Sequence, residues 1–324
     1  MMTLASIEAL EGADPDMVSL LDAVGLPRPD KSPITFWKLV QGHSCVGVVG
    51  AERWGSVALL RSLAVKPTAR RRGFATHLVR TALESLQQQG IREVWLFTET
   101  AHDYFLEWGF LDRSRSHSPR VIETSQEGRG ACPASAALMA LDLTRPVLHV
   151  RRARTTDAAA IAHIYNQGIR DRLATLETAE RTPEDRVVWL TERSKRFPVL
   201  VALDAQGVAG WLSLNPFSPR EAYRSVADVS VYVDGRARRT GVGSRLVQAG
   251  MIEASRQGFH KLVLTLFPEN HAARALYLRR GFQSVGILRE QGVLDGRWRD
   301  TEMMDYLLPS RPPAASEPNA DPRS

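Results

Sequence analysis

The stretch Asp228-Val-Ser-Val-Tyr-Val-Asp-Gly-Arg-Ala-Arg-Arg-Thr-Gly-Val-Gly-Ser-Arg-Leu-Val247 decides the fold of this 324-residue chain. Valines alternate with other residues from Val229 to Val233, which predicts a strand with one buried face. A basic, glycine-rich turn follows, and apolar residues then recur at helical spacing between Leu246 and Met251. The order of elements is therefore strand, turn and helix.

Such a turn suits a phosphate group. The first backbone N–H groups of a helix have no intrahelical acceptor, and the positive end of the helix dipole lies at the same place. Gly241 and Gly243 allow close backbone approach, and Arg236, Arg238 and Arg239 are expected to add positive charge. The P-loop and dinucleotide-binding motifs do not fit, because both the Gly-Lys-Ser/Thr ending and the Gly-x-Gly-x-x-Gly opening are missing.

The Arg-x-x-Gly-x-Gly pattern of Arg238–Gly243 resembles the acetyl-CoA pyrophosphate loop of the Gcn5-related N-acetyltransferases (GNATs). The downstream segment Phe267–Phe282 resembles the second signature of that family. In that signature an asparagine, here Asn270, steadies the cofactor, and a short helix ending in Leu-Tyr277 leads to a Gly-Phe turn. The resemblance implies an acetyl-CoA-dependent acyltransferase of the α/β (α+β) class, with a mixed, splayed central sheet flanked by helices.

The same plan occurs twice in the chain. Leu63–Val79 repeats the layout of the opening stretch, and Arg70, Gly73 and Gly90 each lie 168 positions before their counterparts. A repeat of this length predicts two homologous domains. We place them at residues 1–145 and 146–308, and we expect the proline-rich residues 309–324 to be a disordered tail.

Composition limits the partners. The formal charge is +6 and the pI is about 9.6, but the arginines cluster at the two turns without interleaved aromatic residues. This favours an anionic cofactor over nucleic acid. The two cysteines, Cys45 and Cys132, cannot build a disulfide framework, which favours a reducing compartment. No signal peptide or membrane span is visible, so we predict a cytoplasmic protein that binds no membrane.

The second half, from about Val150 to Leu308, resembles the phosphinothricin N-acetyltransferases and their arsinothricin-modifying relatives. The matching segments are Tyr165-Asn166, Ala174–Thr178, Pro216, Ser230–Val233, Phe267–Asn270 and Gly296–Asp300. This resemblance implies N-acetylation of a small amino-acid-like amine, such as phosphinothricin, arsinothricin or methionine sulfoximine, and hence detoxification. The substrate contacts that it implies are Tyr165, Glu177, Arg220 and Tyr223. A guanidinium such as that of Arg220 suits a carboxylate or phosphinate. The segment Arg289–Asp300 is expected to be a loop that closes over the substrate.

The reaction requires a base, donors for an oxyanion, and an acid. An ammonium group must lose a proton before it attacks a thioester, and Asp228 stands where relatives carry a glutamate as base. Backbone N–H groups of Val231 and its neighbours are predicted to stabilise the oxyanion. Tyr277 is predicted to protonate the departing CoA thiolate.

The predicted acetyl-CoA contacts form one set in each half, and no metal site is predicted. In the second half they are Val231, Tyr232, Val233, Arg238, Arg239, Thr240, Gly241, Val242, Gly243, Ser244 and Asn270. In the first half they are Leu63, Val65, Arg70, Arg71, Arg72, Gly73, Phe74 and Ala75.

The first half resembles the arsenic-resistance N-acetyltransferases over about residues 17–143. The segments that carry the resemblance are Gly50–Gly55, Ala58–Val65, Tyr104–Phe110 and Cys132–Ala136. The repeat assigns Leu60 to the position of Asp228 and Phe105 to that of Tyr277, and neither side chain can transfer a proton. Glu52, expected to be exposed beside a turn, is the nearest candidate base, and Tyr104 is adjacent to the expected acid position. We expect this half to bind acetyl-CoA and to catalyse little, and we interpret Cys132 as a structural thiol rather than an arsenic ligand.

Other classes of function remain open. One alternative is an acetyl-CoA-binding sensor or scaffold, and another is a protein or aminoglycoside acetyltransferase. The chain is expected to be either a monomer whose two domains replace the homodimer common among relatives, or a homodimer.

Overall fold

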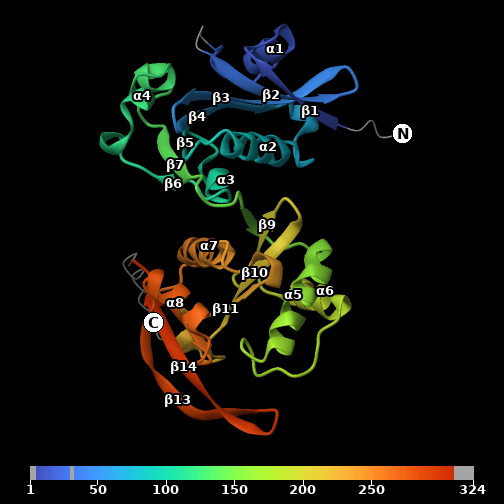
Figure 1. Ribbon diagram of the computed structural model, residues 1–324, viewed down its shortest axis with the longest axis vertical. Coiled ribbons are helices and arrows are strands. Elements are labelled where there is room, and N and C mark those ends of the chain that lie inside the picture. Colours follow the sequence, from blue (N-terminus) through green and yellow to red (C-terminus); the bar gives the residue numbers. More distant parts are fainter. Residues whose placement is uncertain (1–4, 30–32, 310–324) are drawn as a thin grey trace, which may run out of the picture. The chain divides into compact units, whose positions relative to one another are not determined.

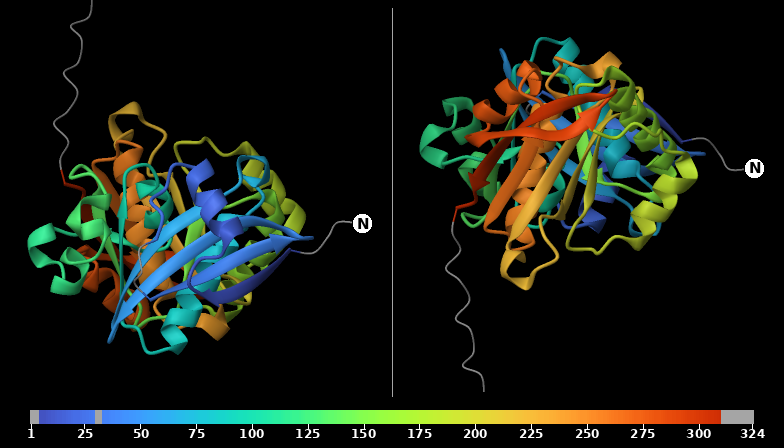
Figure 2. Two further views of the ribbon diagram at one scale, coloured as in Figure 1. Left: turned by 90° about the horizontal axis from the view of Figure 1, so that it is seen from above. Right: turned by 90° about the horizontal axis from the view of Figure 1, so that it is seen from below.

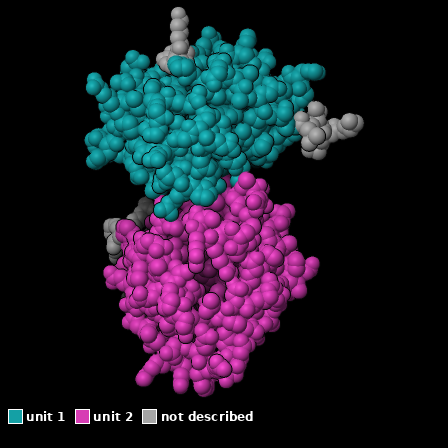
Figure 3. Space-filling model, viewed as in Figure 1, with its two compact units in different colours: residues 1–147 teal, residues 148–324 magenta. Residues whose placement is uncertain are grey.

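The computed structural model describes residues 5–29 and 33–309. The chain divides into two compact units, residues 1–147 and 148–324, which Figure 3 colours separately. We had placed the boundary after Arg145. Apart from Pro309, the predicted disordered tail lies outside the described residues.

Unit 1 is built on a seven-stranded sheet. Its strands are β1 (Ala5–Glu11), β2 (Ile34–Gln41), β3 (Ser44–Trp54), β4 (Val57–Val65), β5 (Glu93–Thr98), β6 (Leu111–Asp112) and β7 (Ala137–Asp142). Its α-helices are α1 (Pro15–Ala23), α2 (Phe74–Gln88), α3 (His102–Leu106) and α4 (Arg120–Glu123).

Unit 2 is also built on a seven-stranded sheet. Its strands are β8 (His149–Arg152), β9 (Val199–Asp204), β10 (Gly207–Pro216), β11 (Val226–Val233), β12 (Lys261–Leu266), β13 (Gln283–Leu294) and β14 (Arg297–Leu307). Its α-helices are α5 (Ala158–Asp171), α6 (Pro183–Glu192), α7 (Val242–Arg256) and α8 (His271–Arg279), and Figure 1 labels most of these elements.

The two sheets have the same topology. The order is β1-β2-β3-β4-β5-β7-β6 in unit 1, and in unit 2 it is β8-β9-β10-β11-β12-β14-β13 when read from the β8 edge. In both sheets one central pair is parallel, β4 with β5 and β11 with β12, and the other pairs are antiparallel. The predicted fold, two tandem domains with mixed sheets flanked by helices, is confirmed.

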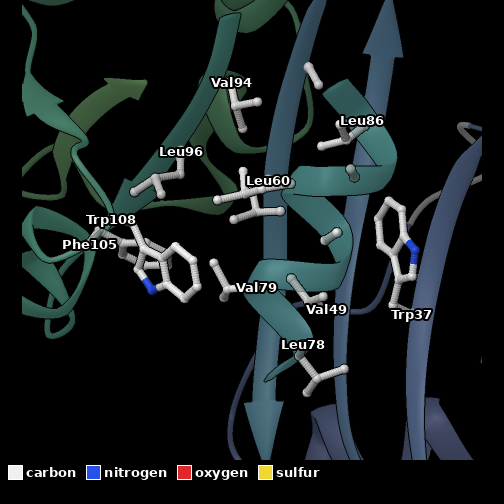
Figure 4. Packing of buried hydrophobic residues seen from close by; sticks show 14 of the residues in the cluster. Trp37, Val49, Leu60, Leu78, Val79, Leu86, Val94, Leu96, Phe105 and Trp108 are labelled. Atoms are coloured by element: carbon white, nitrogen blue, oxygen red, sulfur yellow. The ribbon is translucent and has the colours of Figure 1, made fainter. Parts of the chain in front are cut away.

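The core of unit 1 lies between α2 and the sheet. Leu78, Val79 and Leu86 of α2 are fully buried with Val49 of β3 and Leu60 of β4, as Figure 4 shows. Burying an aliphatic side chain of this size stabilises the fold by about 1.5–3 kcal/mol. This packing fixes the start of α2 close to the end of β4.

Helix α7 repeats this packing in unit 2. Leu246 and Val247 are buried in one cluster with Val229 of β11 and Leu212 of β10. The apolar residues face α7, so alternate residues of β11 face the opposite side of the sheet. Asp228 lies on that opposite side.

Strands β13 and β14 form a long hairpin where we predicted a loop over Arg289–Asp300. Val293 pairs with Trp298, and the turn residues Asp295 and Gly296 both have positive φ values, 49° and 74°. An Asp-Gly pair with such values is typical of a tight hairpin turn. The prediction of a loop was wrong, and the right-hand view of Figure 2 shows the hairpin in orange-red.

Candidate active site

The central parallel strands of unit 2 separate halfway along their length. Strand β11 pairs with β12 only from Val226 to Asp228, although β11 continues to Val233. In an antiparallel ladder, alternate residues direct their N–H and C=O groups away from the partner strand. Because β10 pairs with β11 up to Val233, such groups beyond Asp228 point into the gap beside β12. The same splay occurs in unit 1, where β4 pairs with β5 only from Val57 to Leu59.

The turn after β11 has the backbone shape expected of a phosphate cradle. Arg239 and Gly241 both have left-handed backbone conformations, with φ values of 65° and 100°, and α7 begins at the next residue. Arg71 and Gly73 have φ values of 62° and 81° immediately before α2. Successive turns of this kind before a helix direct backbone N–H groups at an anion. Both turns therefore fit the diphosphate of a CoA molecule.

Two of the three arginines expected to add charge at this turn have carboxylate partners. Arg236 pairs with Asp204 at 2.7 Å, and Arg238 pairs with Asp171 at 2.5 Å. Nearby carboxylates thus engage two of the three arginines, and contacts of these arginines with the cofactor stay a prediction. Arg239 has no carboxylate partner within the described part of the chain.

Asp228, the predicted base, lies half-buried on β11 and opposite Asn215 of β10. The side-chain Nδ2 of Asn215 donates a hydrogen bond to Oδ2 of Asp228 at 3.2 Å. Burial raises the pKa of the Asp228 carboxyl, and the hydrogen bond from Asn215 lowers it in part. A carboxylate with a raised pKa is better suited to accept a proton near neutral pH.

Tyr277, the predicted acid, is buried on α8. Burial raises the pKa of its hydroxyl, and the charge of Asp228 raises it further. The hydroxyl therefore stays protonated at neutral pH and can donate a proton. The charge of Asp228 thus acts on the Tyr277 hydroxyl, and the joint role of the two residues in catalysis stays a prediction.

Asn270 uses its side chain within the protein. Its Oδ1 accepts the N–H of Ala273 at 3.1 Å, and its Nδ2 donates to the carbonyl oxygen of Leu173 at 2.9 Å. Asn270 is thus the N-cap of α8. Its bond to Leu173 ties this helix to the segment that follows α5. A contact between Asn270 and the cofactor stays a prediction.

The predicted substrate residues lie in different environments. Tyr165 of α5 packs against Tyr232 of β11 with ring centroids 4.9 Å apart, on the face of the sheet that carries Asp228. Glu177 is exposed and forms an ion pair with Arg181 at 2.7 Å. Arg220 and Tyr223 are exposed beside a short helical turn, Glu221–Tyr223. Their roles stay predictions.

In unit 1 the position of Asp228 is occupied by Leu59 rather than by the predicted Leu60. Leu59 pairs with Trp95 of β5 as Asp228 pairs with Val263 of β12. Ser62, with a φ of 56°, lies at an irregularity of the β3–β4 pairing that adds one residue to β4. The count along the sequence was therefore wrong by one position at this point.

Glu52 is buried, with 2% of its surface exposed, rather than exposed beside a turn as we expected. It lies opposite Leu59 and forms an ion pair with Arg61 of β4. Arg61 also pairs with Glu127 at 2.6 Å. The guanidinium already engages the Glu52 carboxylate, so Glu52 is poorly placed to accept a substrate proton.

Phe105 takes the place of Tyr277 in unit 1. The N–H of Phe110 donates to the carbonyl oxygen of Phe105 at 3.2 Å, as that of Phe282 does to Tyr277 at 3.0 Å. The neighbouring Tyr104 is largely buried, which raises its pKa to about 12. Unit 1 thus keeps the cradle and the splay but has Leu59 and Phe105 at the positions of the predicted base and acid.

The model of the acetyltransferase (GNAT) family matches residues 8–110 and 163–282 of this chain. The chain therefore belongs to this family, whose co-substrate is acetyl-CoA. The predicted family and enzyme class are confirmed, and the match covers parts of both units.

Individual relatives match about half of this chain. An L-methionine sulfoximine/L-methionine sulfone acetyltransferase of Pseudomonas aeruginosa is 33% identical over 161 residues, which are 49% of this chain and 94% of the relative. Phosphinothricin N-acetyltransferase of Streptomyces viridochromogenes is 32% identical over 170 residues, which are 52% of this chain and 92% of the relative. A Salmonella typhimurium protein solved with its cofactor acetyl-CoA matches with a TM-score of 0.50 and 28% identity, over 52% of this chain and 98% of that one.

Two further classes of site are not found in the described residues. Every helix within residues 5–29 and 33–309 is too short or too polar to cross a bilayer. Over the same residues, no group of three or more His, Cys, Asp or Glu side chains is arranged to hold a metal ion.

Proposed function

We propose that unit 2 transfers the acetyl group of acetyl-CoA to the amine of a small amino-acid-like substrate. The observation that carries this proposal is the position of Asp228 at the point where β11 separates from β12, in the strand that leads into the Arg239–Val242 cradle. The names of the relatives support a substrate of the phosphinothricin or methionine sulfoximine type. The resemblance extends this class to arsinothricin, and the product would be a detoxified amide.

Acetyl-CoA would supply an activated thioester. Its diphosphate would bind at the backbone N–H groups from Arg239 to Ser244, and its acyl end would lie along Val231–Val233, where β11 no longer pairs with β12. Backbone N–H groups in that gap are fixed before the reaction, so they stabilise developing negative charge without reorganising.

Asp228 and Tyr277 would move the protons. The substrate amine is an ammonium ion at neutral pH, and Asp228 would remove one of its protons directly or through a water molecule. Tyr277, which stays protonated because burial raises its pKa, would give a proton to the leaving sulfur. Acetylation removes the positive charge of the amine, and with it the likeness of such a substrate to glutamate.

The substrate side of the site would be formed by residues outside β11. Arg220 would pair with a carboxylate or phosphinate group, because a guanidinium can donate two parallel hydrogen bonds to it. Tyr165, Glu177 and Tyr223 would complete these contacts. Arg220 and Tyr223 are exposed, so the guanidinium of Arg220 and the ring of Tyr223 are available to an incoming molecule.

Unit 1 would bind acetyl-CoA without transferring its acetyl group. Its cradle has the same backbone as that of unit 2, but Leu59 and Phe105 replace the base and the acid. A buried ion pair between Glu52 and Arg61 fills the face on which Asp228 lies in unit 2.

We also propose a cytoplasmic location. Cys45 and Cys132 are both free, Cys45 is buried, and burial raises the pKa of both thiols. Buried thiols of raised pKa are inert packing groups, as expected in a reducing compartment.

A turnover assay on the full chain tests the proposal. With acetyl-CoA and a panel of amino acids that includes phosphinothricin and methionine sulfoximine, we expect release of free thiol. Asp228→Asn should lower kcat by about 10²- to 10⁴-fold and leave acetyl-CoA binding unchanged. The matched control is Asp305→Asn on β14, which loses an ion pair with Lys261 and should keep full activity.

The other classes predict different results in the same assay. A sensor or scaffold would bind acetyl-CoA and release no thiol with any amine. A protein or aminoglycoside acetyltransferase would prefer peptides or aminoglycosides over the amino-acid panel. Full turnover by Asp228→Asn would remove Asp228 from the mechanism.

A further inference from the structure

The carboxylate of Asp228 is held by a donor on the neighbouring strand. Asn215 lies directly opposite Asp228 in the β10–β11 ladder. Its Nδ2 donates to Oδ2 of Asp228 at 3.2 Å and to Oγ of Ser230 at 3.3 Å. An amide has no proton to lose near neutral pH, so it can hold a carboxylate without competing for the substrate proton.

Arg193 fixes the direction in which this amide points. Nη2 of Arg193 donates to Oδ1 of Asn215 at 3.0 Å, and its Nε donates to the carbonyl oxygen of Phe197 at 2.9 Å. Arginine has donors only. The oxygen of the Asn215 amide must therefore face Arg193, and its NH₂ group must face Asp228.

The guanidinium of Arg193 is partly buried among neutral acceptors. It lies 4.5 Å over the ring of Trp189, and it also donates to the carbonyl of Leu214. Burial lowers its pKa to about 10, so it stays charged at neutral pH. No carboxylate pairs with Arg193 within the described residues, and its hydrogen bonds lead through Asn215 to Asp228.

Unit 1 provides an internal comparison for this arrangement. The position of Asp228 is occupied by Leu59, and the position opposite it by Glu52 instead of Asn215. The same sheet therefore forms without the asparagine. The amide donor is present in the unit that has the aspartate and absent from the unit that lacks it.

We infer that Asn215 and Arg193 are positioning residues for acetyl transfer: Arg193 orients the Asn215 amide, and Asn215 holds the Asp228 carboxylate in its ionised form with one oxygen free for the substrate ammonium. This inference rests on the proposed role of Asp228 as base. The charge of Asp228 also acts on Tyr277 of α8. The neighbours of Asp228 along the strands, Val229 of β11 and Val263 of β12, are apolar.

The pH dependence of kcat/KM in the full chain tests the role of Asn215. The base works in its ionised form, and the hydrogen bond from Asn215 favours that form, so its loss raises the pKa of Asp228. Asn215→Leu should move the acid limb of the profile to higher pH by about one unit. Asn215→Asp should move it further, because a second carboxylate opposes ionisation of the first. Acetyl-CoA affinity should stay unchanged in both variants.

A second pair of variants tests Arg193. Arg193→Met should move the acid limb in the same direction and lower kcat. The matched control is Arg196→Met, since Arg196 also donates to a backbone carbonyl, that of Arg224, and lies 4.8 Å over the ring of Phe259. This control should leave the profile in place. If Arg193→Met does not fold, the two Asn215 variants decide the question.

The outcomes separate this inference from the proposed function. An acid limb that stays in place in both Asn215 variants, together with an inactive Asp228→Asn, overturns the positioning role and leaves Asp228 as the base. Full turnover by Asp228→Asn removes Asp228 from the mechanism and overturns the positioning role with it, whereas the absence of thiol release with any amine overturns the proposed function itself. An acid limb that moves upward in the order Asn215→Leu, Asn215→Asp supports both.

Discussion

Tyr277 and Phe105 occupy one position in two copies of one fold, and they differ by a single hydroxyl group. Each backbone carbonyl accepts the N–H of the phenylalanine five residues later, and the ring centroids are 5.5 and 5.4 Å from that phenylalanine. A phenylalanine therefore fits this environment. Replacing Tyr277 should remove the acid and preserve the packing.

We predict that Tyr277→Phe lowers kcat by about 10²-fold with little change in thermal stability or in the Kd for acetyl-CoA. The fall has a chemical cause, since the sulfur then departs without a proton from the enzyme. Turnover assays, thermal unfolding and titration calorimetry on the same preparation measure kcat, thermal stability and the Kd for acetyl-CoA. A variant with unchanged kcat would exclude Tyr277 as the acid.

Single residues were predictable where a motif fixes both the residue type and its neighbours. Asp228 and Tyr277 could be proposed from the sequence because each stands at a set distance from a glycine-rich or Gly-Phe turn. Glu52 and Arg236 could not, because the partner of a long charged side chain depends on which strands are adjacent. Asn215 and Arg193 were missed for the same reason, since 22 residues separate the hydrogen-bonded pair.

At the level of elements, α7 in unit 2 and α2 in unit 1 each pack closely against a glycine of the sheet. A Cβ on Gly210 of β10 would lie 2.9 Å from the carbonyl oxygen of Tyr232 and 3.1 Å from Leu246 of α7. A Cβ on Gly47 of β3 would lie 2.9 Å from Leu78 of α2. Gly210 and Gly47 pair with the last residues of β11 and β4, so both stand beside the cradle.

We predict that Gly210→Ala destabilises unit 2 by about 1–3 kcal/mol and weakens its binding of acetyl-CoA. The added methyl group meets backbone and a buried leucine, so the start of α7 must move, and the cradle moves with it. Thermal unfolding and calorimetry report the two effects. The control is Gly235→Ala, where the nearest atom to a Cβ is Oε1 of Gln167 at 3.6 Å. Equal behaviour of the two variants would contradict this account of the glycine.

Elements were predictable from periodicity, but their exact pairing was not. The helix that the repeat at Leu63–Val79 predicts is α2, which runs from Phe74 to Gln88. The extra residue at Ser62 left no mark in the hydrophobic pattern, because the apolar runs Val57–Leu60 and Leu63–Val65 lie on either side of the Arg61-Ser62 pair. The β13–β14 hairpin was overlooked because β13 is exposed along most of its length and mixes apolar with polar residues without a regular alternation, although the Asp-Gly pair at its turn was a usable signal.

At the level of the whole molecule, one backbone plan carries two different sites. The long offset of the repeat made the tandem predictable, because cores and turns were copied together. The roles that we propose for the copies depend on three positions on the face opposite the helix, occupied by Asp228, Asn215 and Ser230 in unit 2. In unit 1 these positions hold Leu59, Glu52 and Arg61, which form an apolar contact and a buried ion pair.

We predict that the full chain binds two molecules of acetyl-CoA, one in each unit, and that only the molecule bound to unit 2 gives up its acetyl group. Gly73→Glu and Gly241→Glu are matched variants. Each replaces a glycine in a left-handed backbone conformation, with φ of 81° or 100°. Each also places an acidic side chain beside the proposed diphosphate site. Calorimetry should find one molecule bound to either variant. Turnover should persist in Gly73→Glu and disappear in Gly241→Glu. Loss of turnover in Gly73→Glu would show instead that unit 1 takes part in the reaction or is coupled to unit 2, and two molecules bound to Gly73→Glu would exclude its turn as a CoA site.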